Sequence, residues 1–166
     1  MTDFMDSQTV VDLSETAFAS FHDYENSYNT CALFVKNLVD SGALKEGDSV
    51  CYYPNKVILS QRAGDKSSKP IKTDITDSTD ENIISSFNRL YDYIPSVNRI
   101  LVYKNDIRFV RSEAYDIYEQ LVFTFDDGEP DISEDATDFF YYYKCLEPLK
   151  ISKNRYLVFK APSWLD

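Results

Sequence analysis

The sequence predicts a single α+β domain in which three to four helices pack on a mainly antiparallel or mixed sheet of about five to six strands. Three observations support this fold class. The chain has 166 residues, a length that suits one compact domain over residues 1–166. Its hydrophobic content of 43%, with 15% aromatics, is too high for a disordered chain. The expected helices and strands do not alternate regularly enough for a doubly wound parallel sheet.

Two helices are expected near the N-terminus. Ser14 is a suitable N-cap for a first helix of about two turns, because its hydroxyl can accept from an N–H of the first turn. A wide apolar arc over residues 31–39 predicts a second helix that belongs to the core. Gly42 follows this arc and is suited to the C-terminal cap.

Two more helices are expected further along the chain. Ser78 and Glu81 have the spacing of a capping box, in front of an amphipathic run that predicts a helix over about 79–93. Pro95 ends that helix, since proline cannot donate to the ladder of helical hydrogen bonds. Ser133 is expected to cap a helical segment that runs through about residue 145.

The strands are expected in two hairpins and two single segments. Pro54-Asn55 and Asn105-Asp106 supply turn residues between apolar runs, and the second pair can adopt the positive φ angles of a tight hairpin turn. Alternation of apolar and polar residues supports the neighbouring strands. The expected strands are residues 49–53, 56–60, 99–104, 107–111, 119–125 and 155–160.

The chain is strongly acidic, with a formal net charge of -11, and the charge is unevenly spread. Acids are concentrated in residues 1–48, in residues 74–81 and after residue 125, and we expect them to converge on one negative face. Residues 49–72 instead hold five bases and one acid. Within this stretch, Gly, Ser, Pro and spaced lysines predict a mobile, solvated loop over 62–73. The loop has no arginine cluster or interleaved aromatics that would favour nucleic-acid contact.

The most informative stretch is an acidic ledge, which we define as residues 126–138. Seven carboxylates stand there without any Lys or Arg, and an aromatic block at 139–143 follows directly. Its first part, 126–135, is expected to be an acidic loop. Carboxylates of one sign steer a basic partner, and tyrosines in a desolvated patch anchor it. The candidate binding residues are Asp126, Asp127, Glu129, Asp131, Glu134, Asp135, Asp138, Tyr141 and Tyr142.

The ledge has a simpler interpretation and a metal-binding one. A solvated acidic loop that places Glu134 and Asp135 at a helix N-terminus explains the same residues, and this interpretation is compatible with a binding role. The acids from Asp127 to Asp138 also match the ligand spacing of a calcium loop. Ile132, however, stands where that loop needs a glycine, and Asp138 stands where it needs a bidentate glutamate. We therefore predict no metal site.

No catalytic residue set emerges from the sequence. The single histidine, His22, is the only imidazole base for the three scattered cysteines, and nothing in the spacing signals a Cys–His pair or a zinc site. Phosphate-binding and nucleophile-elbow motifs are also absent from the sequence. We therefore expect no enzyme activity and no cofactor. The odd number of cysteines, the lack of a signal-like N-terminus and the lack of a long apolar run predict a cytoplasmic protein with reduced thiols.

These observations predict a non-enzymatic acidic inhibitor that neutralises a basic protein. Toxin-immunity proteins and phage-encoded inhibitors are examples of this class, and a nuclease toxin or another nucleic-acid-binding enzyme is the kind of partner expected. A DNA mimic is a narrower version, in which carboxylates stand at phosphate-like intervals. The alternatives are a small enzyme that uses carboxylate or tyrosine chemistry, and a cytosolic effector chaperone. Neither direct nucleic-acid contact nor a membrane is expected, and the oligomeric state stays open.

Overall fold

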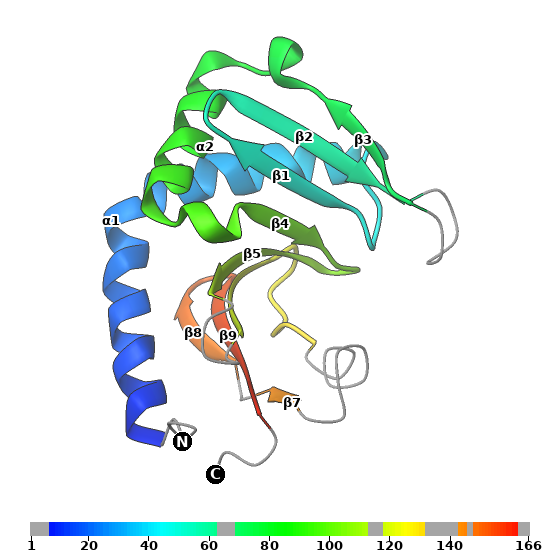
Figure 1. Cartoon of the computed structure of the whole chain (residues 1–166). Coiled ribbons are helices and arrows are strands. Elements are labelled where there is room, and N and C mark those ends of the chain that lie inside the picture. The colour runs from blue at the N-terminus through cyan, green and yellow to red at the C-terminus, as the bar shows by residue number, and fades with distance from the viewer. Residues whose placement is uncertain (1–6, 63–68, 113–117, 132–142, 146–147, 163–166) are drawn as a thin grey trace.

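The computed structural model describes residues 7–62, 69–112, 118–131, 143–145 and 148–162. Two α-helices pack on a nine-stranded sheet in which every strand pair is antiparallel, so the α+β class is confirmed (Figure 1). The predicted numbers were wrong. The sheet has more strands than the five to six expected, and the described residues form two α-helices instead of three to four.

The elements follow one another in the order helix, three strands, helix and six strands, with two short 3-10 helices. The sheet order is β3-β2-β1-β4-β5-β6-β9-β7, and β8 also pairs with β9. The elements are α1 Ser7–Asp40, β1 Ser49–Tyr53, β2 Lys56–Gln61, β3 Ile71–Asp74, η1 Thr76–Ser78, α2 Glu81–Tyr93, η2 Pro95–Val97, β4 Arg99–Val102, β5 Asp106–Ser112, β6 Tyr118–Thr124, β7 Tyr143–Cys145, β8 Leu149–Ser152 and β9 Arg155–Pro162.

Helix α1 includes both of the helices expected near the N-terminus, joined as two segments that run in different directions (Figure 1). The two segments meet at a kink at Tyr24, where φ is -117° and ψ is 15°. Neither Gly nor Pro occurs between residues 7 and 41, so the sequence lacks the residues that most often end a helix. Gly42 then ends α1 as expected, with φ of +82° and its N–H donating to the carbonyl of Val39.

Helix α2 forms where it was predicted, but its cap is different. Asp80 is the N-cap, and its Oδ1 accepts from the backbone N–H of Asn82 at 2.8 Å. The expected capping box was therefore wrong: Ser78 lies in η1, where its hydroxyl donates to the carbonyl of Ile75. Aspartate is as good an N-cap as serine, so local composition did not decide between the two. Pro95 begins η2 directly after the helix.

Both predicted hairpins form, although the second has a different turn. Asn55 has a φ of 58° between β1 and β2, as expected from Pro54-Asn55. At the other turn neither Asn105 nor Asp106 has a positive φ, and Asp106 already belongs to β5. The turn closes instead through the N–H of Tyr103, which donates to the carbonyl of Asp106 at 2.9 Å. This shift by one residue brings the carboxylate of Asp106 into the sheet.

Strands β3, β7 and β8 were not predicted. Residues 71–73 of the expected loop 62–73 belong to β3, whereas residues 63–68 lie outside the described residues. Residues 143–145 of the expected helix 133–145 form β7, and residues 132–142 also lie outside the described residues. Each of these strands is short and owes its conformation to pairing with β2 or β9.

The main core lies between the helices and one face of the sheet. Alternate residues of the strands point into it, as in Val57 and Leu59 of β2 and Ile100 and Val102 of β4. Phe87 of α2 is fully buried at its centre. On the opposite face, Val122 of β6 and Tyr156 and Val158 of β9 form a second buried cluster, so this half of the sheet is covered on both sides.

Candidate acidic binding surface

The described part of the acidic ledge, residues 126–131, follows directly after β6. It includes four of the nine predicted binding residues, and all four carboxylates are exposed: Asp126, Asp127, Glu129 and Asp131. The other five predicted residues lie outside the described residues: Glu134, Asp135, Asp138, Tyr141 and Tyr142. The candidate surface that can be analysed is therefore a turn with four carboxylates.

Hydrogen bonds fix the start of this turn. The hydroxyl of Thr124, the last residue of β6, donates to the carbonyl of Asp126 at 2.8 Å. The N–H of Phe125 donates to the carbonyl of Asn105 at 3.0 Å, which ties the turn to the β4–β5 connection. Oδ1 of Asp126 accepts from the N–H of Gly128 at 2.9 Å, in the manner of an Asx turn. One of the four carboxylates thus shapes the backbone that presents the others.

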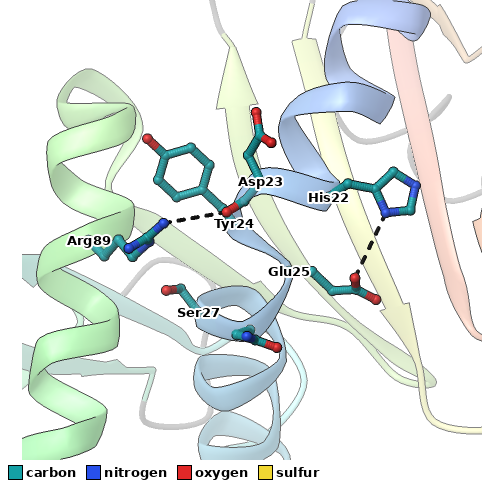
Figure 2. Close-up of a pocket in the computed structure, with 7 residues that line it drawn as sticks. His22, Asp23, Tyr24, Glu25, Ser27 and Arg89 are labelled. Carbon is teal, nitrogen blue, oxygen red and sulfur yellow. Dashed lines mark hydrogen bonds and ion pairs between the residues drawn. The ribbon is translucent and has the colours of Figure 1, made fainter.

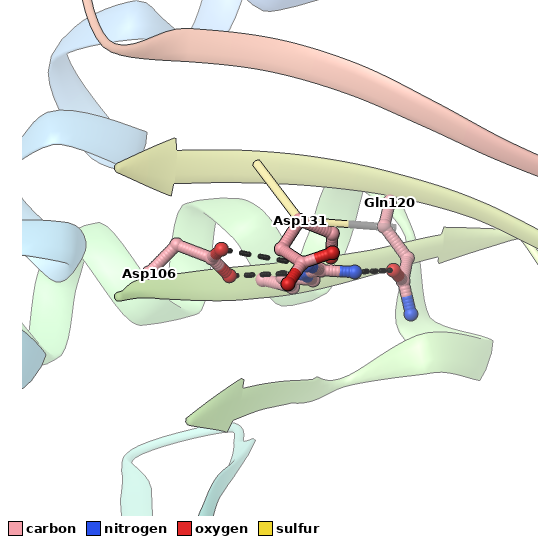
Figure 3. Close-up of polar contacts among 4 residues, drawn as sticks. Asp106, Gln120 and Asp131 are labelled. Carbon is pink, nitrogen blue, oxygen red and sulfur yellow. Dashed lines mark hydrogen bonds and ion pairs between the residues drawn. The ribbon is translucent and has the colours of Figure 1, made fainter. Parts of the chain in front are cut away.

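A buried arginine fixes the other end of the turn (Figure 3). Arg108 of β5 is 1% exposed, and its Nη2 donates to the carbonyl of Asp131 at 2.9 Å. Its Nε donates to Oδ1 of Asp106 at 2.8 Å, and its Nη1 donates to Oε1 of Gln120 at 3.5 Å. The guanidinium also stacks on Tyr103, with 3.8 Å between Cζ and the ring centroid. A buried guanidinium needs such partners, and one of them is the backbone of the ledge.

Sequence analysis missed this anchor, although part of its signal was present. Asp106 and Arg108 are two residues apart, a spacing that puts both side chains on the same face of a strand. The pair Asn105-Asp106 predicts a turn, where this spacing does not place two side chains on one face. The contact with Asp131 depends on the path of the chain after β6, which no local pattern reports.

The ion pair between Lys153 and the ledge is weak. Nζ of Lys153 lies 3.9 Å from Oδ1 of Asp127, and both side chains are more than 80% exposed. Exposed pairs of this kind contribute between zero and about 1 kcal/mol. This pair therefore removes little of the negative field of the turn.

Two of the acidic segments that were expected to converge lie apart. Asp74, Asp77, Asp80 and Glu81 lie on β3, η1 and the start of α2, at the β3 side of the sheet (Figure 1). The described ledge leaves β6, five strand positions away, which is roughly 24 Å at the usual spacing. These two groups therefore form separate acidic surfaces.

A polar cavity of about 230 Å³ lies at the kink of α1 (Figure 2). It is lined by residues 22–27 of α1 and by Arg89 of α2. Nη2 of Arg89 donates to the carbonyl of Asp23 at 3.5 Å, and its Cζ lies 5.1 Å from the ring centroid of Tyr24. Tyr24 stacks on Tyr93 with 4.1 Å between centroids. These contacts hold the kink against α2, and the cavity is smaller than the roughly 300 Å³ at which ligand pockets begin.

The cysteine–histidine arrangement considered from the sequence does not form with Cys31. Its side chain is completely buried in α1, and burial raises the pKa of the thiol, which keeps it protonated. His22 lies nine residues earlier, on the other side of the kink at Tyr24; its side chain is exposed, and its Nδ1 lies 3.8 Å from Oε2 of Glu25. The side chain of Cys145 lies outside the part that can be described.

A second buried ion pair, between Arg111 of β5 and Glu119 of β6, predicts an unusual pH dependence. Nε of Arg111 lies 3.5 Å from Oε1 of Glu119, and the side chains are 4% and 12% exposed. Neither of these two atoms makes a hydrogen bond within the described structure. Burial raises the pKa of Glu119, and the charge of Arg111 only partly opposes this rise.

We expect the Glu119→Gln variant to lose part of the pH dependence of stability. Between the ordinary value of 4.5 and the raised folded pKa, the folded state holds a proton that the unfolded state has released. The Glu119 carboxyl therefore makes the free energy of unfolding fall as pH rises through this window. Urea unfolding of both proteins from pH 4 to pH 8 measures the difference between their slopes. Equal slopes would contradict the predicted role of Glu119.

The described residues include neither a membrane-spanning helix nor a group of metal ligands, and the comparisons with known proteins gave no match. None of the described helices is both long enough and apolar enough to cross a membrane. Within the described ranges, no three His, Cys, Asp or Glu side chains are grouped so that they can hold a metal ion. Comparisons with models of protein families, with curated proteins and with solved structures found no match.

Proposed function

We propose that this chain is a non-enzymatic acidic inhibitor that binds and neutralises a basic protein through the acidic ledge. The observation that carries the proposal is the group of four exposed carboxylates on a turn that is anchored at both ends. Toxin-immunity proteins and phage-encoded inhibitors act in this way, and a nuclease toxin or a similar nucleic-acid-binding enzyme is the partner class that fits.

The anchoring favours binding because it lowers the entropy lost on association. Thr124 and Arg108 hold the two ends of the turn before any partner arrives, so its backbone does not have to be ordered on binding. The exposed carboxylates keep their hydration until contact and supply a field of one sign at a short distance. Such a field raises association rates with a basic surface and disfavours acidic ones.

The test compares two triple variants with the same change in charge. Asp126→Lys, Asp127→Lys and Glu129→Lys reverse the ledge, whereas Glu46→Lys, Asp77→Lys and Asp92→Lys reverse exposed acids elsewhere. Each protein is used at low salt to capture binding proteins from the source cells, and the captured protein is identified, purified and titrated by calorimetry. We expect the ledge variant to bind about 10- to 100-fold more weakly than the control, and the wild-type affinity to fall in about 0.3 M salt.

Two results would contradict this function. The first is that the wild type captures no basic protein at low salt. The second is that the captured partner binds the ledge variant and the control variant equally well. Circular dichroism of both variants establishes that each remains folded, and Asp126→Asn, which keeps an acceptor for the N–H of Gly128, separates the lost charge from the lost hydrogen bond of the turn.

The DNA-mimic version makes a narrower prediction. If the ledge occupies a nucleic-acid-binding groove, duplex DNA competes with the chain for the purified partner, and the ledge variant does not displace DNA. If the partner binds DNA and this chain at the same time, the proposed inhibitor acts outside that groove and the mimic version fails.

A further inference from the structure

The sheet is covered on both sides at β5, β6 and β9 but has an open face at β1–β4. Residues that alternate with the core positions of these strands point away from the helices, and none of them is buried. We define this open face by Ser49, Cys51, Tyr53, Lys56, Ile58, Ser60, Lys72, Asp74, Arg99 and Leu101. Apolar side chains in its middle, Ile58 and Leu101, are half-buried, and the ring of Tyr53 is 41% exposed.

The open face is basic, in contrast to the protein as a whole. It has three cationic residues, Lys56, Lys72 and Arg99, and one carboxylate, Asp74. Asp74 accepts hydrogen bonds from the N–H and the hydroxyl of Thr76, which lower the pKa of its carboxyl. Lys72 and Arg99 both act on the thiol of Cys51, which places the two cations around the centre of the face.

The acidic ledge lies on the same side of the sheet as this basic face. Leu101 of β4 is directly opposite Arg108 of β5, and residues opposite each other in an antiparallel pair point to the same side. Arg108 holds the carbonyl of Asp131, so the end of the turn lies on this side. Thr124, paired with Asp106 on the same side of β6, holds its start. An acidic patch and a basic patch therefore lie on the same side of the sheet, with the ledge after β6 and Lys72 on β3.

We infer that the open face binds a second copy of this chain in a two-fold dimer. A two-fold axis parallel to the strands, between the two patches, turns the open faces of the two copies toward each other and sets the ledge of each copy over the basic face of the other. Lys72, which the register places at the ledge end of the sheet, then faces the ledge of the other copy twice, and the half-buried side chains Ile58 and Leu101 lie inside the contact. The inference concerns the free chain and does not depend on the proposed function.

The dimer is expected to be weak and sensitive to salt. Four strands about 4.8 Å apart and five residues long cover on the order of 250 Å², well below the roughly 800 Å² per partner of a stable interface. The net charge of -11 on each copy also opposes association at long range. At physiological salt, charges more than about 8 Å apart are largely screened, so the complementary patches outweigh the distant acids.

The experiment uses a pair of charge-swapped variants of the full chain. Lys56→Glu with Lys72→Glu makes the open face acidic, and Asp126→Lys with Asp127→Lys makes the ledge basic. Analytical ultracentrifugation over a range of concentrations measures the oligomeric state of each. We expect the wild type to dimerise reversibly at high concentration and both variants to be monomeric. In a dimer of either variant, the open face of one copy and the ledge of the other carry charges of the same sign and repel each other.

The decisive sample is an equimolar mixture of the two variants. In the mixed dimer the acidic face of one meets the basic ledge of the other, and the basic face meets the acidic ledge, so both contacts are attractive again. We expect the mixture to dimerise at least as well as the wild type. The control, Lys36→Glu with Lys45→Glu, carries the same charge change outside the open face and is expected to dimerise normally.

A local readout adds to the oligomeric state. The half-buried thiol of Cys51 lies within the open face, so its labelling by a maleimide, followed by peptide mass spectrometry, is expected to slow as the protein concentration rises.

Three results would overturn the inference: a wild type that stays monomeric at the highest concentration, a dimer that the Lys56 and Lys72 substitutions leave intact, or folded variants whose mixture remains monomeric. Because these measurements use the protein alone, they fail or succeed independently of partner capture. If the dimer forms, it covers the ledge, and a basic partner must compete with it.

Discussion

Replacing Arg108 by Ala is expected to lower the free energy of unfolding by about 3 to 5 kcal/mol. The substitution leaves the carboxylate of Asp106, which is 2% exposed, buried without the guanidinium that neutralises it. It also removes the donors to Gln120 and to the carbonyl of Asp131. Asp106→Ala should lower the free energy of unfolding by a similar amount, because it leaves the buried guanidinium of Arg108 without its carboxylate partner. Urea unfolding followed by circular dichroism measures both.

A double variant separates two quantities: the destabilisation caused by one unpaired buried charge, and the net contribution of the ion pair to stability. Asp106→Leu with Arg108→Met replaces both charges by apolar groups, and we expect it to be more stable than either single alanine variant. Lys153→Ala is the control, because its exposed pair with Asp127 predicts a change within about 0.5 kcal/mol. A loss below about 1 kcal/mol for Arg108→Ala would mean that the buried network does not hold the sheet and the ledge together.

Replacing Phe87 by Ala is expected to cost about 3 to 5 kcal/mol as well, through loss of core packing. Phe87 is fully buried between both helices and the sheet. Its ring lies 5.8 Å from that of Phe34 on α1 and 5.2 Å from that of Tyr52 on β1, centroid to centroid. A cavity at this point weakens three elements at once, since it separates α2 from both of its neighbours.

The controls for Phe87 use a milder substitution and an exposed position. Phe87→Leu keeps most of the volume and is expected to cost less than about 1.5 kcal/mol, so a measurable protein exists even if the alanine variant does not fold. Leu33→Ala removes an apolar side chain that is 60% exposed on α1, with an expected change within about 0.5 kcal/mol. Similar losses for Leu33→Ala and Phe87→Ala would contradict the position of Phe87 at the centre of the core.

Local sequence patterns predicted the elements whose own residues carry the signal. Strand β2 alternates Val57 and Leu59 with exposed or half-buried residues, and α2 presents Phe87 and Leu90 on one face. Both patterns arise from burial on one side, which leaves a trace in the sequence. Strand β3 leaves none, because all four of its residues are exposed and its conformation comes from pairing with β2.

The candidate site divides in the same way. The run of carboxylates is visible in the sequence, and the four described members are exposed on a turn, whereas their role in binding stays a prediction. The anchor at Arg108 was not visible. It depends on the register that sets Leu101 opposite Arg108 and on the return of the chain over that position at Asp131, and both are long-range properties.

The pairing of β1 with β4, which we call the seam of the sheet, has a consequence for the kinetics of folding. Hairpins β1–β2 and β4–β5 involve residues close in sequence, but the seam pairs Ser49 with Leu101, and β2, β3 and α2 lie between them in the chain. Closing so long a loop lowers the entropy of the chain before the contacts between β1 and β4 can stabilise the folded state. The two local hairpins therefore form early, and the search for this one distant register sets the pace at which the whole sheet assembles.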